Sequence, residues 1–343
     1  MPFEIGPLEG VGVVGSGTAF PALTLSNEDV LRSTGLSEER LAFLADGARQ
    51  TLGVERRSWA HRVGTPLAHA DEETTLDLAV LAAQAALAEA GLTGADLALV
   101  LVATSTPHRM TASVAAAVGS AIGARAACAD VRAGCAGGVL ALGQAALAVA
   151  AGTGPVLVIG AETFSKIVPP QSRTAALSLG DGAGALVIGR REGCALLGAF
   201  FETDGALGRL ITTDGALPPT EAEVARGGYL LSGAPDELLQ IVPGRYQTAL
   251  DRVLGRAGLD PAAIDLYVPH QTSSDLIRRV ATEAGFASSR VYSHVERHAN
   301  IGAAGWIVAL AEARSEGRCS TGKRIAVAAV GGGLSWGAAV LRC

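Results

Sequence analysis

Residues 87–104 read LAEAGLTGADLALVLVAT, and residues 254–268 read LGRAGLDPAAIDLYV, two stretches built on the same plan. In each, an apolar helical run ends at a Gly-Leu turn, a short polar link follows, and a strand-like apolar run completes the unit. Both strands lead to a Pro-His pair, Pro107-His108 in the first and Pro269-His270 in the second. The shared order predicts one helix-turn-strand unit that occurs twice in the chain.

The repeat continues beyond these stretches. Arg132-Ala-Gly-Cys135 precedes an apolar helical run, and Arg297-His-Ala-Asn300 precedes another at an offset of 165 residues. After each helical run come a strand with a glycine-containing turn and then a closing strand, at 156–162 and 183–189 in the first copy and at 325–333 and 337–343 in the second. Several matching segments in the same order make chance a poor explanation.

This duplication predicts an α/β protein of two similar halves, residues 1–192 and 193–343, related by a pseudo-two-fold axis. Strands that are almost continuous in Val, Ile, Leu and Ala predict sheets covered by helices on both faces. We interpret the segments outside the repeat as insertions or caps, where function often resides: 17–75, 162–180 and 200–245.

Composition excludes several classes of protein. Of the 343 residues, 49% are hydrophobic and 17% are charged, which excludes a disordered chain. The 33 acidic and 27 basic residues leave 33 − 27 = 6 net negative charges, which argues against a sequence-independent nucleic-acid binder. The five cysteines form no CxxC motif, and the N-terminus shows no signal-peptide pattern, so we expect reduced thiols in the cytoplasm.

Two other features are interpreted as structural. His61, His69 and Asp71 have no compact metal-ligand spacing, so we expect solvated loop residues and no metal site. Residues 133–161 carry no charge over a length that could span a membrane. Because Gly152-Thr153-Gly154-Pro155 interrupts this run, we predict a buried helix, a turn and a buried strand.

Three residues are candidates for chemistry. Cys135 opens an apolar helix, and because a helix N-terminus favours a thiolate, we expect Cys135 to be the most reactive thiol. The alternative is that Cys135 is a small hydrophobic residue in a buried helix. His270 follows a buried strand, where open α/β sheets bind ligands, although a hydrogen-bonded turn histidine also fits. Asn300 matches Cys135 in the repeat, either as an amide donor at the same cavity or as a helix N-cap.

Glycine clusters complete the set. Gly331-Gly332-Gly333 follows a buried strand and can expose backbone N–H groups as oxyanion donors. The stretch VVGSGTAF at 13–20 only partly matches a dinucleotide fingerprint, because Phe20 stands where the last glycine belongs. A Rossmann oxidoreductase is therefore weakly supported.

The motifs DVRAGCAGG around Cys135, VPHQ around His270, RHAN around Asn300 and the closing GGGLSWGAAVL resemble the β-ketoacyl-acyl-carrier-protein synthase III family. The stretch LGDGAGALVIG at 179–189 matches that family too. The resemblance implies a thiolase-like fold, with two pseudo-symmetric αβαβα halves in five layers, and a homodimer. It implies Cys135 as the acylated nucleophile, His270 with Asn300 as donors to a thioester enolate, and the N–H groups of Cys135 and Gly332 as the oxyanion hole.

The sequence also departs from the family pattern. Gly47 stands where the family often has a tryptophan that stacks on the adenine of coenzyme A, and Arg173 is at a coenzyme-A-facing position. After His270 the family's HQANLR becomes HQTSSD, with Ser273 and Asp275 in place of Asn and Arg. A carrier-docking basic pair becomes Thr282-Glu283, for which Arg278 and Arg279 are possible substitutes. Met110 occupies the position of a dimer-loop residue that closes the acyl pocket.

These residues leave three hypotheses. In the first, an acyl group loads on Cys135, and a malonyl-type thioester decarboxylates and condenses with it in a specialised, polyketide-like pathway. In the second, the acyl group passes to an alcohol or amine without carbon–carbon bond formation. The third is a catalytically silent partner subunit, against which the intact Cys, His and Asn set argues. In the first two the substrates are coenzyme A or carrier-protein thioesters, and no resident cofactor or nucleic acid is expected. The resemblance also implies that the strand at 156–160 and the Met110 loop lie at a two-fold interface.

Overall fold

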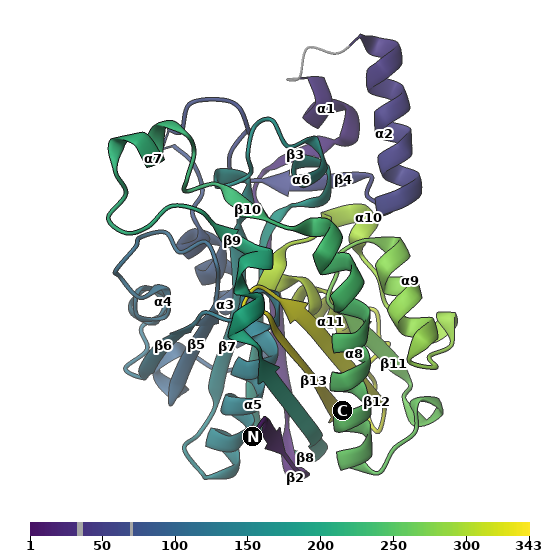
Figure 1. The fold of residues 1–343 in the computed structure, drawn as a ribbon. Helices are drawn as coiled ribbons and strands as arrows, with labels where there is room; N and C mark the ends of the chain where they lie inside the picture. Colours follow the sequence, from purple (N-terminus) through teal and green to yellow (C-terminus); the bar gives the residue numbers. More distant parts are fainter. Residues whose placement is uncertain (33–36, 69–70) are drawn as a thin grey trace.

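The structure, a computed structural model, describes residues 1–32, 37–68 and 71–343. Its centre is one continuous nine-stranded mixed sheet with the path β11-β12-β13-β8-β7-β5-β6, onto which β1 and β2 pair through β8 (Figure 1). Strand β8 (Asp181–Thr203) is 23 residues long and serves both halves of this sheet. Its first part pairs with β7 and its second part with β13. The predicted boundary at 192/193 therefore falls inside the strand that joins the halves.

The other strands of the main sheet are short and mostly apolar. They are β1 (Phe3–Ile5), β2 (Leu8–Ala19), β5 (Leu99–Ala103), β6 (Ala127–Val131), β7 (Val156–Thr163), β11 (Leu266–Pro269), β12 (Arg324–Gly331) and β13 (Ser335–Arg342). Two small hairpins stand apart from it: β3 (Leu23–Ser26) with β4 (Arg56–Trp59), and β9 (Ile211–Thr213) with β10 (Leu231–Gly233).

The helices of the layers flank this sheet. They are α3 (Thr75–Ala90), α4 (Val114–Ala121), α5 (Gly137–Ala150), α8 (Pro235–Ala257), α9 (Ser274–Glu283) and α11 (Gly305–Ser315). The remaining helices are shorter or belong to the cap: α1 (Asn27–Arg32), α2 (Glu38–Leu52), α6 (Arg173–Ser178), α7 (Glu221–Ala225) and α10 (Val295–His298).

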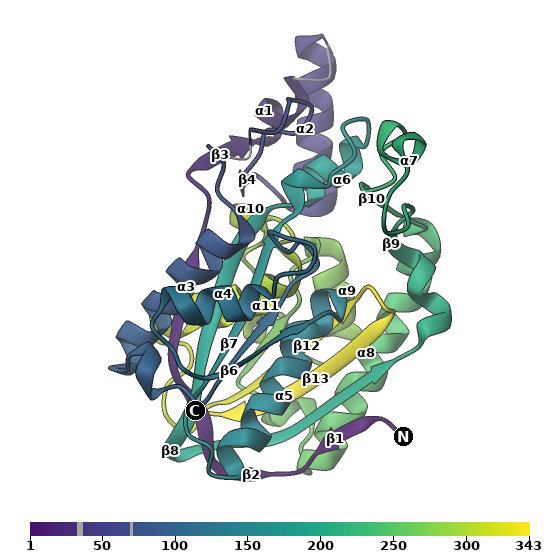
Figure 2. The same ribbon diagram turned by 90° about the vertical axis from the view of Figure 1, so that its left-hand side faces the viewer.

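Five layers result, as predicted. Helices α3 and α4 cover one face of the first sheet half, α5 and α11 lie between the halves, and α8 and α9 cover the second half (Figures 1 and 2). The largest apolar cluster combines the central helices with strands of both halves, and two further clusters lie under the outer helices. All eight residues of β7 are buried, as expected for a strand covered on both faces.

The sequence repeat corresponds to a structural repeat. Helices α3 and α8 both end at a left-handed glycine, Gly91 with φ 67° and Gly258 with φ 65°. Their N–H groups return to the carbonyls of the preceding helical turn, the usual glycine C-cap. Strands β5 and β11 follow, and they pair in parallel with β7 and β12, the strands that come after the central helices α5 and α11.

The uncharged run at 133–161 forms α5, a turn and β7, which confirms the prediction of a buried helix and strand. Within the described ranges, no helix is long and apolar enough to cross a membrane. The weakly supported dinucleotide motif does not form, because residues 13–19 belong to β2 and lead into strand β3 with no helix directly after them.

One expectation about β7 is wrong. Residues 156–160 were expected at a two-fold interface, but β7 is hydrogen-bonded to β5 on one side and to β8 on the other. Both of its edges are therefore used within the chain. Strand β6 ends the sheet path instead, and its five residues are only partly buried.

The segments outside the repeat form a cap above the strand ends. The hairpin of β3 and β4, with α1, α2 and α6, encloses a separate apolar cluster centred on residues such as Leu41, Trp59 and Leu177. Helix α7 and the hairpin of β9 and β10 extend beside it (Figure 1). The cap and these loops form one end of the molecule, and the site described next lies beneath them.

Candidate active site

Cys135 lines a cavity of about 240 Å³ beneath the cap. It lies in the short 3-10 helix η2 (Gly134–Ala136), immediately before α5. The other walls come from strand ends and cap segments: Thr104, Ser105, Arg132, Gly134, Phe164, Ile167, Ile211, Thr212, Thr213, Leu231 and Gly332. The cavity therefore exposes one thiol to a chamber that is part polar and part apolar.

Backbone segments from the two halves meet at this thiol. A Cβ atom on Gly331 would lie 2.2 Å from the backbone nitrogen of Cys135, and one on Gly134 would lie 2.3 Å from that of Gly332. Any side chain at either glycine would therefore collide with backbone. Cys135 and Gly332, the two residues predicted to supply oxyanion donors, therefore lie close together, and both line the cavity.

His270 follows β11 and is 1% exposed. Its backbone N–H donates to the carbonyl of Ala328 at 2.7 Å, while neither ring nitrogen has a partner. The start of α11 lies against the ring, since a Cβ on Gly305 would be 3.0 Å from Nδ1. Burial, reinforced by nearby His294, lowers the pKa of His270 to about 3, so the imidazole is neutral and can donate from one nitrogen.

Asn300 lies between α10 and the 3-10 helix η7 (Gly302–Ala304), which leads into α11. Its Oδ1 accepts a hydrogen bond from the N–H of Gly302 at 2.9 Å, a local turn contact, whereas the N-cap of η7 is Ile301. Because Oδ1 has this partner, the amide NH₂ is the group left to donate to a ligand. Asn300 is therefore not the N-cap that the sequence offered as an alternative.

The two pseudo-symmetric helix starts meet, as the repeat predicts. The segment η2, which holds Cys135, packs against η7, which follows Asn300. His270 touches the first residue of α11. The segments that carry these three groups therefore lie side by side, but only Cys135 forms part of the cavity wall, and His270 is buried.

Glu162, at the end of β7, was not among the predicted site residues. It is fully buried, accepts hydrogen bonds from the N–H of Ser105 at 3.0 Å and from the Thr106 hydroxyl at 2.6 Å, and lies close enough to Cys135 to act on its charge. Burial raises the pKa of Glu162 to about 7 despite these donors. A carboxylate at the end of an otherwise apolar strand, VLVIGAE, was the available signal.

Burial together with the Glu162 carboxylate raises the pKa of Cys135 to about 12. This shift opposes the thiolate that the helix N-terminus alone favours. Desolvation and a neighbouring negative charge outweigh the N–H groups of the helix start. Cys135 rests as a thiol and must lose its proton as it reacts.

The other predicted site residues lie outside the cavity wall. Met110 is 66% exposed on the loop before α4. Arg173 is exposed at the first residue of α6, and the Ser273 hydroxyl accepts from the N–H of Leu276 as the N-cap of α9. On α9, Arg278 pairs with Asp275 at 2.6 Å and Arg279 pairs with Glu283 at 2.8 Å. Gly47, in α2, has open space at its Cβ position.

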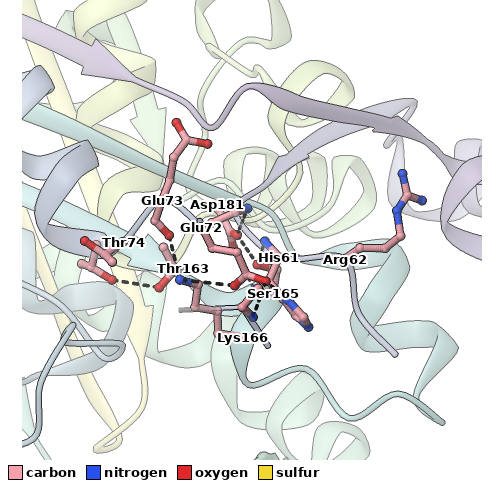
Figure 3. Close-up of polar contacts among 12 residues, drawn as sticks. His61, Arg62, Glu72, Glu73, Thr74, Thr163, Ser165, Lys166 and Asp181 are labelled. Carbon is pink, nitrogen blue, oxygen red and sulfur yellow. Dashed lines mark hydrogen bonds and ion pairs between the residues drawn. The ribbon is translucent and has the colours of Figure 1, made fainter. Parts of the chain in front are cut away.

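A polar cluster fixes the cavity wall at residues 164–167. Asp181 accepts from the N–H and hydroxyl of Ser165, and Lys166 donates to the carbonyl of Glu73 at 2.7 Å (Figure 3). His61 is 5% exposed and bonds Glu72 at 2.7 Å, so its prediction as a solvated loop residue is wrong. This cluster ties the cap loop to the segment that carries Phe164 and Ile167.

His69 lies outside the described residues. Among the residues that the structure describes, no group of three His, Cys, Asp or Glu side chains could hold a metal ion.

Comparisons with known proteins agree with this geometry. A profile of 3-oxoacyl-[acyl-carrier-protein] synthase III matches residues 129–205, and the profile of its C-terminal part matches residues 254–343. The chain is 38% identical to the β-ketoacyl-[acyl-carrier-protein] synthase III of Paracoccus denitrificans, over 89% of this chain and 93% of that protein. It is 34% identical to synthase III 5 of Streptomyces coelicolor, over 97% and 98%.

Solved structures give the same result. The synthase III of Aquifex aeolicus superposes with a TM-score of 0.85 at 29% identity, covering 97% of this chain and 100% of that one. The priming β-ketosynthase of the R1128 polyketide pathway superposes with a TM-score of 0.84 at 26% identity, covering 98% of each chain. The structures share the fold of the whole chain, including both halves.

Proposed function

Because the chain belongs to the β-ketoacyl-acyl-carrier-protein synthase III family of condensing enzymes, we propose that it loads an acyl group on Cys135 and extends it with a malonyl-type thioester. The observation that carries this proposal is the packing of η2, which holds Cys135, against η7, which follows Asn300, beside a cavity lined by Cys135 and Gly332. The Cys135 sulfur and the substrates supply every reacting group, so the proposed reaction needs no resident cofactor.

In the first step, the Cys135 sulfur attacks the carbonyl carbon of an acyl thioester. A new C–S bond forms, the bond to the donor thiol breaks, and the proton of Cys135 leaves with that thiol. The negative charge that develops on the carbonyl oxygen would be met by the N–H groups of Cys135 and Gly332. Their approach within the cavity supports this role.

In the second step, a malonyl-type thioester loses carbon dioxide, and the electron pair moves into a thioester enolate. The neutral ring of His270 and the NH₂ of Asn300 would donate hydrogen bonds to the enolate oxygen. The enolate carbon then attacks the acyl carbon on Cys135, a C–C bond forms, and the C–S bond to Cys135 breaks. The released sulfur takes up one proton for each turnover.

Acyl transfer to an alcohol or amine is the second candidate. One observation favours it: the Oδ1 of Asn300 already accepts from the N–H of Gly302, a structural task that does not require an enolate. In such a transfer His270 would accept the proton of the attacking hydroxyl or amine. This candidate predicts acyl loading on Cys135 without release of carbon dioxide.

Partners and pathway follow from the same proposal. We propose a homodimer, supported by the partly exposed edge strand β6, with the exposed Met110 entering the partner's acyl pocket. Coenzyme A or an acyl carrier protein would present the thioesters. The likeness to the R1128 priming ketosynthase supports a specialised polyketide role beside fatty-acid initiation. The Arg–acid pairs on α9 support weaker docking of an acidic carrier than free arginines would give.

The deciding experiment separates loading from decarboxylation. The protein is incubated with a panel of acyl-coenzyme A and acyl-carrier-protein thioesters, and the mass added to the Cys135 peptide is measured. In parallel, carbon dioxide release from malonyl thioesters is followed in Cys135→Ala, which should keep partial decarboxylation. Asn300→Ala should lower decarboxylation ~10²–10³-fold, the usual loss for one oxyanion donor, with acylation of Cys135 retained. If no donor releases carbon dioxide, the condensation hypothesis is wrong and acyl transfer takes its place.

A further inference from the structure

Three of the five cysteines meet far from the cavity, where β13 ends. Strand β13 pairs with β8 in a register that sets Arg342 opposite Ala195, so Cys343 and Cys194 come next to each other. On its other side, the N–H of Cys343 donates to the carbonyl of Lys323 at 3.0 Å. The turn that follows Cys319 therefore lies beside the same strand end, and Cys319 and Cys343 pack against the same apolar cluster.

The thiols of Cys319 and Cys343 interact directly. The Cys319 side chain donates a hydrogen bond to the Cys343 sulfur, which lowers the pKa of Cys343 and raises that of Cys319. The charges that face Cys343 are cationic, Arg314 and Arg191, and both favour its thiolate. Both thiols are half-buried, whereas Cys194 is 4% exposed.

Cys128 and Cys135 have the opposite electrostatic environment, whereas arginines also face Cys194 and Cys319. Asp130 and burial raise the pKa of Cys128, and Glu162 and burial raise that of Cys135. Cys343 thus combines a partly exposed sulfur, a donor thiol and two facing arginines. A thiolate is the reactive form of cysteine, so the donor thiol and the two arginines favour reaction at Cys343.

We propose that Cys343 and Cys319 form an oxidisable thiol pair, a modification site in which Cys343 reacts first with small disulfides and Cys319 resolves the product. The Cys343 sulfur attacks one sulfur of the small disulfide, breaks its S–S bond and releases one small thiolate. The Cys319 sulfur then attacks the Cys343 sulfur in the mixed disulfide, loses its proton and releases the second small thiol. Two protein thiols are oxidised to one disulfide, and one small disulfide is reduced to two thiols.

The bond would close a loop that contains β12, Gly332 and β13. These strands pair along their full length, from Arg324 opposite Arg342 to Gly331 opposite Ser335. The cross-link therefore joins the open end of a hairpin whose closed end carries the oxyanion glycine. We expect it to raise the unfolding temperature, because it restricts the unfolded chain, and to leave acyl loading on Cys135 unchanged.

The test treats the intact protein with oxidised glutathione, blocks free thiols and digests with trypsin. Cleavage after Arg318, Lys323 and Arg342 should give residues 319–323 joined by a disulfide to Cys343. Cys319→Ser should instead hold glutathione on Cys343, and Cys343→Ser should take up far less glutathione at Cys319. Cys128→Ser is the matched control and should form the same cross-link as the parent.

Two results would overturn the proposal. One is a first glutathione adduct on Cys135 or Cys128 with Cys343 unmodified. The other is a Cys194–Cys343 disulfide in place of the Cys319 link, which would show that the buried thiol resolves the adduct. Neither result bears on the proposed condensation, because acylation of Cys135 is measured separately on its own peptide.

Discussion

Gly134 and Ala299, which precede Cys135 and Asn300 at matching positions of the repeat, share a left-handed backbone angle, with φ of 54° and 55°. Ala299 is the one non-glycine residue with positive φ in the described ranges. The same sharp turn therefore presents the nucleophile in one half and the amide in the other. Internal symmetry extends to the backbone that aims the two side chains.

This turn makes Ala299 sensitive to substitution. With φ 55° and ψ −155°, it occupies a region that side chains rarely adopt, and its methyl group is fully buried. Ala299→Val should lower the free energy of unfolding by about 2 kcal/mol or more, because a β-branched side chain adds strain and overpacking. Ala299→Gly should stay within about 1 kcal/mol of the parent, since relief of strain offsets the lost methyl contact and the added chain entropy.

Chemical denaturation of the three proteins measures this difference. Ala313→Val, at another fully buried alanine but in the regular helix α11, is the control for overpacking alone. Equal losses in the two valine variants would mean that backbone strain at Ala299 contributes nothing.

The charge of Glu162 should control the reactivity of Cys135. The pKa of Glu162 is raised to about 7, so above neutral pH its carboxylate opposes formation of the Cys135 thiolate. Glu162→Gln removes that charge and should speed alkylation of Cys135 by iodoacetamide several-fold at pH 8. At pH 6, where the native carboxyl is protonated, the two proteins should react at similar rates.

Peptide mass spectrometry of Cys135 gives these rates, and Cys128 in the same samples is the internal control because Asp130, not Glu162, acts on it. A pH-independent effect of the substitution would show a rearranged site instead of a removed charge.

The stability of the protein provides a second check on Glu162. A buried acid with a raised pKa binds its proton more tightly in the folded state, so its stabilising contribution is lost as pH rises from 4.5 to about 7. Glu162→Gln should flatten that decline by up to about 3 kcal/mol.

The repeat was sufficient to predict the layered fold and the positions of Cys135 and Asn300, because helix caps and apolar strands are local signals. The order of the strands was not local: β7 lies between β5 and β8, and only three-dimensional pairing shows that its edges are occupied. The pKa of Cys135 depends on Glu162, 27 positions away in sequence (162 − 135) and held by donors from a third segment. The pKa of Cys135 could not be predicted from the helix start alone, because it depends on burial and on residues from distant segments.

Ion pairs on α9 should limit docking of an acidic carrier protein. Arg278 and Arg279 are exposed, but each is paired with an acid on its own helix. Replacing Asp275 by Ser and Glu283 by Gln should free both arginines and lower the KM for carrier-protein substrates about two- to fivefold, the range expected for exposed charge pairs. The KM for the matching coenzyme A thioester should not change.

The gain should disappear at high salt, because exposed charges are screened. Glu192→Gln, an exposed acid on β8, is the control for net charge. If both substrate classes respond equally to the α9 substitutions, the helix does not contact the carrier.

The exposed side chain of Met110 should set the length of the acyl group if two chains pair. On a single chain it is 66% exposed and lies outside the wall of the Cys135 cavity, so a task in acyl selection requires a second copy. Met110→Ala should then shift acyl loading toward longer chains by about tenfold, since room for about two methylene groups is worth about 1.6 kcal/mol. Loading of short acyl groups should fall little.

Light scattering should show a dimer at micromolar concentration. Leu239, an exposed apolar residue on α8, provides the control, because Leu239→Ala should leave the acyl preference unchanged. If the protein is a monomer and Met110→Ala still alters the acyl preference, Met110 contacts the pocket of its own chain through movement of the loop. If the protein is a dimer and the preference is unchanged, Met110 does not select the acyl group.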